Sequence, residues 1–238
     1  MAGLGTLMNV AGILAGGLAG LIFGKFMTQR YQDTLTMACG VSVMFIGIAG
    51  TMEKMMSVAG QSLTSGGTMM MIGSFMIGSL LGEWMNIEHY LEELGRWLKA
   101  KTGSSGDKLF VDGFVTASLT VCIGAMAVVG AIQDGIYGNY SILAAKAVLD
   151  LIIILVMTAS MGKGCLFCAI PVGVFQGFIT FLARLIEPFM TEAALNNLSL
   201  TGSMLIFCVG VNLIWGKKIK VANMLPTLLI AVIWAGTG

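Results

Sequence analysis

Residues 4–24 read LGTLMNVAGILAGGLAGLIFG, a run that contains no charged side chain. A helix that crosses the hydrocarbon core of a bilayer needs ~20 apolar residues at about 1.5 Å per residue. The run therefore predicts a membrane-spanning helix. No basic segment precedes it and the first charge is Lys25, so we expect a retained anchor and not a cleaved signal peptide.

Seven further apolar runs follow this first one. With it, the predicted spans are 4–24, 36–52, 66–83, 110–132, 141–160, 164–184, 199–215 and 222–236. The turn at 160–164 is so short that the runs on either side of it could form a tight hairpin or a broken pair, which leaves seven spans as the alternative. The sequence predicts an all-α polytopic transmembrane bundle of about eight spans, forming a single integral membrane domain over residues 1–238.

The composition supports a lipid-facing exterior. Hydrophobic residues make up 57% of the chain and charged residues only 11%, against roughly 25% charged in ordinary soluble domains. A soluble domain of this length would need charge over most of its surface. The net charge of +1 and the lack of interleaved basic and aromatic residues exclude a nucleic-acid surface. Membrane lipid is therefore the expected surroundings of the chain.

Most basic residues fall on one side of the membrane when successive loops are assigned alternately to its two sides. Ten of the thirteen fall together: Lys25, Arg30, Arg96, Lys99, Lys101, Lys108, Lys163, Lys217, Lys218 and Lys220. The other three are Lys54, Lys146 and Arg184. Because cytoplasmic loops carry an excess of lysine and arginine, the ten are expected in the cytoplasm and both termini outside.

Residues 86–101 form an amphipathic pattern. One helical face carries the apolar residues Ile87, Tyr90, Leu91, Leu94, Trp97 and Leu98, and the opposite face is charged. This spacing predicts a helix that lies in the headgroup region, anchored on the cytoplasmic side. A regulatory or partner-binding helix is the alternative.

An internal repeat is visible when residues 5–21 are aligned with residues 67–83, where six of the seventeen positions are identical. We place the two copies at about 4–54 and 66–134. Because each copy holds an even number of helices, the two would share one orientation, as in the parallel repeats of transporters.

Small residues recur every four positions in two of the predicted spans. They are Gly12, Gly16, Gly20 and Gly24 in the first, and Ser74, Gly78 and Gly82 in the third. Such faces let helix backbones approach closely, within one subunit or across an oligomer interface. A homo-oligomer, for example a dimer, is the expected assembly.

Polar side chains inside apolar spans are candidates for function, because an unsatisfied polar group in hydrocarbon costs several kcal/mol. Six are expected to line the pathway or bind the solute: Asn9, Thr116, Ser118, Thr120, Gln176 and Asn212. Gln176 follows Pro171 and Gly173, which can bend a helix and free a backbone carbonyl. The alternative is that these side chains only fasten helices together.

Charged and amide groups form a second set, with roles in ion coupling or gating. Lys146 and Asp150, spaced i and i+4, can neutralise each other either as a structural ion pair or as a coupling site. Asp112 is a further coupling candidate.

Two short motifs add the remaining candidates of that set. Gln133 and Asp134 end a span as a gate or as a solvated helix end, and Asp134 is also a candidate for ion coupling. Asn223, before Pro226, can cap the last span or bind an ion.

Enzyme chemistry lacks its usual motifs. The single histidine, His89, rules out a His-Glu-x-x-His metalloprotease, and neither Gly-x-Ser-x-Gly nor a phosphate-binding Gly-Lys-Ser/Thr loop occurs. Five cysteines lie in apolar stretches and suit packing; only Cys165 and Cys168 form Cys-x-x-Cys, a weak metal signal without a second pair. We expect no enzyme activity, no metal and no cofactor.

Three segments carry a family resemblance: Gly5-Thr6-Leu7-Met8-Asn9, the stretch from Phe114 to Gly135 that ends in Gln133-Asp134-Gly135, and Asn223-Met224-Leu225-Pro226. Nearly the whole chain resembles the YqgA/YdfK-like family of uncharacterised bacterial multi-pass inner-membrane proteins. The resemblance implies a bacterial inner-membrane location and one compact domain, and it implies no activity.

These features together favour a secondary transporter for a small polar or ionic solute, such as an amino acid or a small organic acid. A passive channel and a non-transporting scaffold or sensor subunit are the alternatives.

Overall fold

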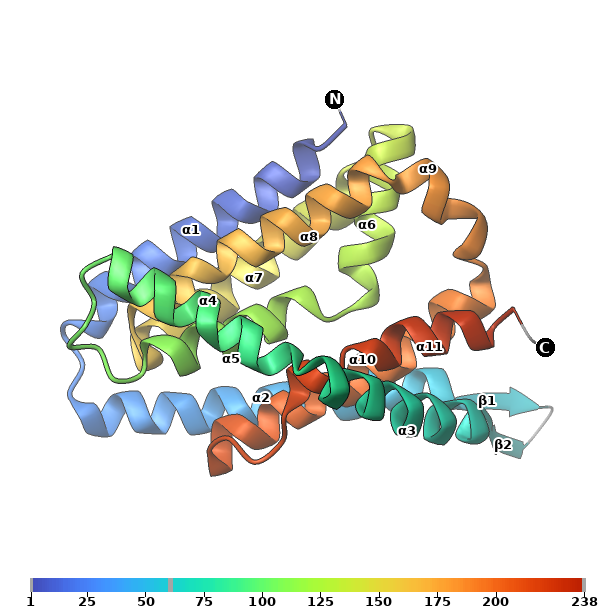
Figure 1. Ribbon diagram of the computed structural model, residues 1–238, viewed down its shortest axis with the longest axis horizontal. Helices are drawn as coiled ribbons and strands as arrows, with labels where there is room; N and C mark the ends of the chain where they lie inside the picture. Colours follow the sequence, from blue (N-terminus) through green and yellow to red (C-terminus); the bar gives the residue numbers. More distant parts are fainter. Residues whose placement is uncertain (1, 60–61, 237–238) are drawn as a thin grey trace.

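The computed structural model describes residues 2–59 and 62–236, and these residues are almost entirely helical (Figure 1). The α-helices are α1 Leu4–Gly24, α2 Gln29–Met55, α3 Thr68–Met85, α4 Ile87–Lys101, α5 Phe110–Cys122, α6 Ala125–Tyr137, α7 Ser141–Met161, α8 Ala169–Phe181, α9 Ala183–Ile186, α10 Glu192–Trp215 and α11 Pro226–Trp234. The 3-10 helices are η1 Lys163–Cys168, η2 Glu187–Phe189 and η3 Val221–Met224. The all-α prediction is confirmed.

One exception is a small hairpin between α2 and α3, which the sequence analysis did not predict. Strands β1 Met56–Ala59 and β2 Ser62–Ser65 pair antiparallel, with Met56 opposite Ser65. The hairpin projects from the bundle, and β2 is exposed along its length (Figure 1). Both strands are short and include polar residues, so the apolar pattern that marks the spans does not extend to them.

Five helices in the described part of the chain are long and apolar enough to cross a membrane: α1, α2, α7, the continuous η1–α8 segment and α10. A sixth is obtained if α5 and α6 count as one span. The expected number of eight is not confirmed. The predicted continuous span 110–132 was wrong, because α5 and α6 meet at an angle of 62°.

Proline in the sixth predicted span does not bend its helix. Pro171 lies in the first turn of α8, where a missing backbone N–H is tolerated. The irregular backbone lies before it, in η1, which follows Gly162 with φ of 89°.

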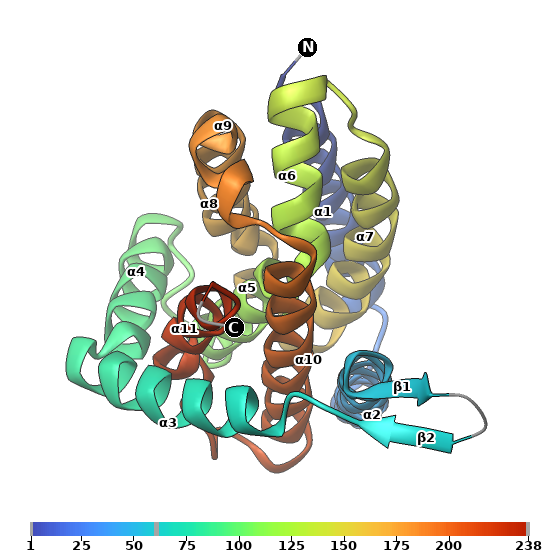
Figure 2. The ribbon, with the colours of Figure 1, turned by 90° about the vertical axis from the view of Figure 1, so that its right-hand side faces the viewer.

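Three helix pairs build the bundle: α1 with α7, α2 with α10, and α3 with η3–α11. Glycines lie at each contact. A Cβ added at Gly16 would overlap the backbone carbonyl of Leu151 in α7, and one added at Gly47 would lie 2.5 Å from the backbone nitrogen of Phe207 in α10. Helix α5 lies among these pairs and carries the fully buried Phe110 and Phe114 (Figure 2).

The two predicted repeat copies make different contacts. Along α1, Gly12 and Gly24 lie against Ala147 and Ala159 of α7, so these two helices run in the same direction. Helix α3 runs opposite to η3–α11, since its residues 78 and 82 face residues 227 and 223. The parallel repeat stays a prediction.

The polarity of the bundle is visible in Figure 1. The ends of α1, α4 and α7 and the beginnings of α2 and α5 gather at one end, away from both chain termini, the hairpin and α9. Most of the ten clustered basic residues flank these helix ends. The side of the membrane on which each end lies stays a prediction.

Helix α4 begins within one residue of the predicted amphipathic helix and ends with it. Leu98 is buried, and Ile87, Leu91 and Leu94 pack partly against the core. Two other predicted members of the apolar face, Tyr90 and Trp97, are exposed. Much of the apolar face is thus covered by protein, and the headgroup location stays a prediction.

Candidate functional site

The break between α5 and α6 is the centre of the candidate site. Ile123 has extended backbone angles, and Gly124 has φ of 154°, a conformation that side chains rarely adopt. The α5 helix ends here, so its last carbonyls lose their partners within the helix. One of them, the carbonyl of Val121, accepts a hydrogen bond of 2.8 Å from the Lys146 ammonium.

Lys146 also forms the ion pair that its spacing predicts. Its Nζ lies 2.5 Å from Oδ2 of Asp150, and the two residues are only 6% and 3% exposed. The ammonium therefore joins a carboxylate of its own helix to the carboxyl end of α5. The partial negative charge at a helix C-terminus favours a cation at this position.

Two amides are fully buried in α1 and α8. Asn9 of α1 and Gln176 of α8 are 0% exposed, and neither side chain has a hydrogen-bond partner among the described residues. Asn9 faces the Asp150 carboxylate. The α1 and α8 helices run in opposite directions, with Thr6 and Thr180 3.5 Å apart through their hydroxyl oxygens, so Asn9 and Gln176 both lie about one turn further along (Figure 1).

A cavity of about 190 Å³ leads toward the break along one face of α5. Leu109, Asp112, Thr116 and Leu119 share this face because they are spaced three or four residues apart. The separation of ten positions between Leu109 and Leu119 corresponds to about 15 Å of helix. Leu119 lies one turn before Ile123, so the inner end of the cavity approaches the break.

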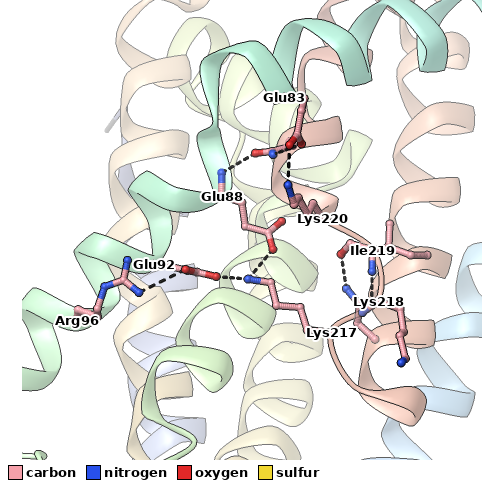
Figure 3. A network of polar contacts seen from close by, with 10 residues as sticks. Glu83, Glu88, Glu92, Arg96, Lys217, Lys218, Ile219 and Lys220 are labelled. Atoms are coloured by element: carbon pink, nitrogen blue, oxygen red, sulfur yellow. Dashed lines mark hydrogen bonds and ion pairs between the residues drawn. The ribbon is translucent and has the colours of Figure 1, made fainter.

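Three charged residues that line the cavity form an ion-pair network (Figure 3), and the exposed Lys217 among them marks the end of the cavity that we call its mouth. Lys217, in the loop between α10 and η3, lies 2.7 Å from Oε1 of Glu88 and also bonds Glu92, both on α4. The hydrogen bond from Lys217 lowers the pKa of Glu92. Partial burial lowers the pKa of Lys217, but Glu88 and Glu92 outweigh this effect and leave the pKa raised. Both members are thus held in their charged forms.

Asn212 closes the loop that carries Lys217. Its Oδ1 accepts hydrogen bonds of 2.9 Å from the backbone nitrogens of Lys218 and Ile219, and its Nδ2 donates to the Ile219 carbonyl at 2.7 Å. The side chain was predicted to bind solute. It lines the cavity, but these polar atoms serve the loop.

Asn223 caps a helix other than its own. Its Oδ1 accepts a 2.7 Å hydrogen bond from the backbone nitrogen of Glu88 at the start of α4, and its Nδ2 donates to Oε2 of Glu83. The expectation that it caps the last span was wrong, because η3 places the side chain against α4 instead. Lys220 lies 2.6 Å from Oε1 of Glu83 and completes this side of the network (Figure 3).

Residues 4–236 match the model of a family described as a protein of unknown function, DUF554. The chain belongs to the DUF554 family. It is 30% identical to the uncharacterized membrane protein YdfK of Bacillus subtilis (strain 168) over 95% of this chain and 93% of that protein. It is 25% identical to the uncharacterized protein YqgA of Escherichia coli (strain K12) over 96% and 94%. No solved structure matches the chain.

The family match confirms the resemblance that the three sequence segments indicated. Together with the long apolar helices and a relative named as a membrane protein, it identifies this DUF554 chain as a multi-pass helical membrane protein. The relatives supply no activity, so the chemistry has to be argued from the site.

Two predicted solute ligands of the DUF554 chain bond their own helix instead. The Ser118 hydroxyl donates to the Phe114 carbonyl at 2.6 Å, and the Thr120 hydroxyl donates to the Thr116 carbonyl at 2.8 Å. Neither lines the cavity, whereas Thr116 does. Hydroxyl groups in apolar helices commonly satisfy themselves in this way.

Asp134 lies neither at a solvated helix end nor at the cavity. It is 0% exposed, and its Oδ2 accepts a 2.9 Å hydrogen bond from the backbone nitrogen of Gly5 in the first turn of α1. A carboxylate suits this place because a helix N-terminus carries partial positive charge. Gln133, its neighbour, accepts a hydrogen bond from Asn139 at the exposed end of α6.

Sequence reasoning missed three members of the site: Glu88, Glu92 and Lys217. The two glutamates are one turn apart on the charged face of the 86–101 helix, so their spacing was a signal for a shared cation. The lysine comes from 125 residues further along the chain. A single sequence gives no indication of that contact.

Replacing Asn223 by alanine is expected to lower the free energy of unfolding by about 1 kcal/mol, the usual value of a lost helix cap. The cause is the backbone N–H of Glu88, which loses its acceptor. Thermal unfolding of the purified protein in one detergent measures the effect. Asn196→Ala, at an exposed position of α10, is the control; equal melting temperatures for the two variants would contradict the capping role.

Proposed function

We propose that this DUF554 chain is a secondary transporter of a small polar or ionic solute, such as an amino acid or a small organic acid, and not an enzyme. The observation that carries the proposal is the break between α5 and α6. At this break, Lys146 of the buried Lys146–Asp150 pair donates a hydrogen bond to the last turn of α5, and a cavity approaches the same place.

Burial of charge supports a functional role for the pair. Charged side chains within membrane-spanning segments are costly and mark ion or substrate pathways. A simple structural pair is also weak as a source of stability, because desolvation can exceed the Coulombic gain. The Lys146–Asp150 pair is therefore better accounted for by a coupling role, in which binding of an ion or proton changes the pairing.

The broken helix supports a binding role. Irregular backbone at membrane depth is tolerated only where protein or a water-filled cavity surrounds it. In transporters, discontinuous helices expose carbonyls and helix ends to substrate and coupling ion near the middle of the bilayer. The Val121 carbonyl at the end of α5 is a group of this kind.

One end of the site is lined by a cavity and the other end is closed by protein, an arrangement that alternating access requires. The cavity ends near Leu119, while Asn9 and Gln176 are completely buried between α1 and α8. A passive channel in its open state would instead have a continuous opening. A cavity whose lining reaches Leu119 but includes neither Asn9 nor Gln176 therefore favours a transporter over a channel.

Reconstitution into liposomes tests the proposal. A thermal-shift screen of amino acids, organic acids and ions first identifies a stabilising solute, and uptake of that solute is then measured with and without a proton or sodium gradient. Wild-type uptake is expected to saturate and to depend on the gradient. Asp150→Asn is expected to lose at least about tenfold of the gradient-driven rate, a barrier change of about 1.4 kcal/mol.

The matched control is Asp33→Asn, because Asp33 is an exposed aspartate of α2 whose carboxylate accepts a hydrogen bond of 2.8 Å from the Gln29 side chain. It is expected to behave like the wild type. Uptake that rises linearly with concentration and ignores the gradient would show a channel. No measurable uptake of any tested solute, together with a second protein that co-purifies in a fixed ratio, would show a scaffold subunit.

A further inference from the structure

Negative charge dominates the lining of the cavity. Its charged members are the carboxylates of Glu88, Glu92 and Asp112 and the ammonium of Lys217. Three carboxylates and one ammonium among the described lining residues leave an excess of negative charge in a partly enclosed space. Such a space attracts cations and repels anions.

Glu88 has bonding capacity to spare. The residue is 4% exposed; its Oε1 pairs with Lys217, but its Oε2 is buried with no hydrogen-bond partner in the part of the chain that the structure describes. A buried carboxylate oxygen without a donor is unfavourable. A cation with several N–H donors, placed beside Glu88, would satisfy it.

Lys217 already occupies the position where such a cation would bind. Its ammonium bridges Glu88 and Glu92, yet its side chain is 46% exposed. The residue follows Gly216, which has φ of 75°, in the short loop that Asn212 holds closed. The lysine can therefore leave the carboxylates for solvent without unfolding a helix.

We propose that the mouth of the cavity is an ammonium subsite that Lys217 fills in the absence of solute. The solute is a small primary amine, either cationic or an amino-acid zwitterion, whose ammonium group displaces Lys217 from Glu88 and Glu92. This inference rests on the proposed transport function for its role, but not for its binding chemistry.

The size of the cavity agrees with a small amine. Its volume of about 190 Å³ equals the share of about six water molecules in the liquid, at ~30 Å³ each. Displacement of Lys217 would also release the tie between α4 and the loop that joins α10 to η3. Solute binding would thereby loosen one end of the bundle, as a transport cycle needs.

The test measures binding, without flux, to the full-length protein in nanodiscs at low salt. The probes are 1,4-diaminobutane, the neutral 1,4-butanediol and the dianion succinate, which share one chain length. Only the diamine is expected to bind the wild type. Lys217→Met is expected to bind it about tenfold more tightly, since the internal competitor is gone. Glu88→Gln is expected to bind it at least tenfold more weakly.

Two further variants keep the test decisive. Lys218→Met removes the neighbouring exposed lysine and is expected to leave the affinity unchanged. Asp112→Asn removes an exposed carboxylate of the lining and is expected to weaken binding even if Glu88→Gln fails to fold. Succinate binding in place of the diamine, or equal effects of the two lysine variants, would overturn the inference.

Flux separates this inference from the proposed function. If the diamine binds with the expected order of affinities among the variants but is not taken up into liposomes, the result would support the ammonium subsite and contradict the transporter function. Coupled uptake of a dianion by a protein that does not bind the diamine would support the transporter and remove the ammonium subsite.

Discussion

Replacing Gly82 with alanine is expected to cause a larger loss of stability than the same replacement at any other glycine that the structure describes. A Cβ at this position of α3 would overlap the backbone carbonyl of Asn223 in η3. Backbone cannot rotate away as a side chain can, so α3 and η3 would have to separate. Overpacking of a core typically costs about 1–3 kcal/mol, and an overlap with backbone is expected at the upper end of this range. The shift would also displace the Asn223 cap on α4, and with it Glu88 at the cavity mouth.

Gly177→Ala is the matched control for this experiment. Gly177 also lies within a helix, α8, but no side chain and no backbone of another element among the described residues lies within 4 Å of an added Cβ. Alanine there is expected to be neutral or to stabilise by about 0.5–1 kcal/mol, because glycine weakens helix interiors. Thermal unfolding and size-exclusion profiles of both variants in one detergent give the comparison. A Gly82→Ala protein as stable as Gly177→Ala would contradict the close packing of α3 on η3.

Asp150→Ala is expected to lower the free energy of unfolding by about 3–5 kcal/mol, the cost of leaving a buried charge without its partner. Lys146 would keep only the Val121 carbonyl as a bonding partner. The double variant Lys146→Met, Asp150→Ala removes both charges and is expected to recover most of the loss. Transport should not recover with it, since the coupling groups are gone.

A double-mutant cycle measures this coupling directly. Melting temperatures are compared for the wild type, Lys146→Met, Asp150→Ala and the double variant. The surface pair Lys54–Glu53, 2.9 Å apart and partly exposed, supplies the control: Glu53→Ala is expected to cost less than about 1 kcal/mol. An Asp150→Ala variant no less stable than the double variant would show that the pair is not buried as described.

Local patterns made several features predictable. The apolar runs located α1, α7 and α10, because a membrane-spanning helix must be long and apolar. Helix α10 begins earlier than expected, at Glu192. The amphipathic spacing located α4 to within one residue. The spacing of Lys146 and Asp150 predicted their contact, since residues four apart share a helix face.

The helix break could not be read from hydropathy. Residues on both sides of Ile123 and Gly124 are apolar, so the mean hydropathy over twenty residues indicates one continuous span. The signal was conformational: only glycine tolerates the backbone angles found at Gly124. Glycine is so frequent in this chain that one such position does not stand out.

Long-range contacts were equally hidden. Asn223 reaches Glu88 from 135 residues away, and Asp134 reaches Gly5 from 129. Each of these polar side chains was recognised as important, but its partner depends on how helices pack. For Asn223, the local sequence favours a cap on the helix that follows it, but in the folded chain its side chain caps α4 instead.

A recurrence not found in the sequence is visible in the fold. The long helices α7 and α10 each end at a glycine of positive φ, Gly162 at 89° and Gly216 at 75°. A lysine follows each glycine: Lys163 begins η1, and Lys217 lies four residues before η3. Each of these two 3-10 helices leads to a helix with proline in its first turn. The Lys217 loop thus has a counterpart beside the entry to α8.

Thiol labelling tests most directly whether the polar face of α5 lines a water-accessible route. Thr116→Cys and Ser118→Cys are made in a protein whose five native cysteines are replaced by alanine, and a membrane-impermeant thiol reagent is applied to each face of the membrane. Thr116 lines the cavity and Ser118 is buried on another face of the same helix. Cys at 116 is expected to react from one face at least about tenfold faster than Cys at 118. Equal, minimal reaction of both positions from both faces would contradict the route.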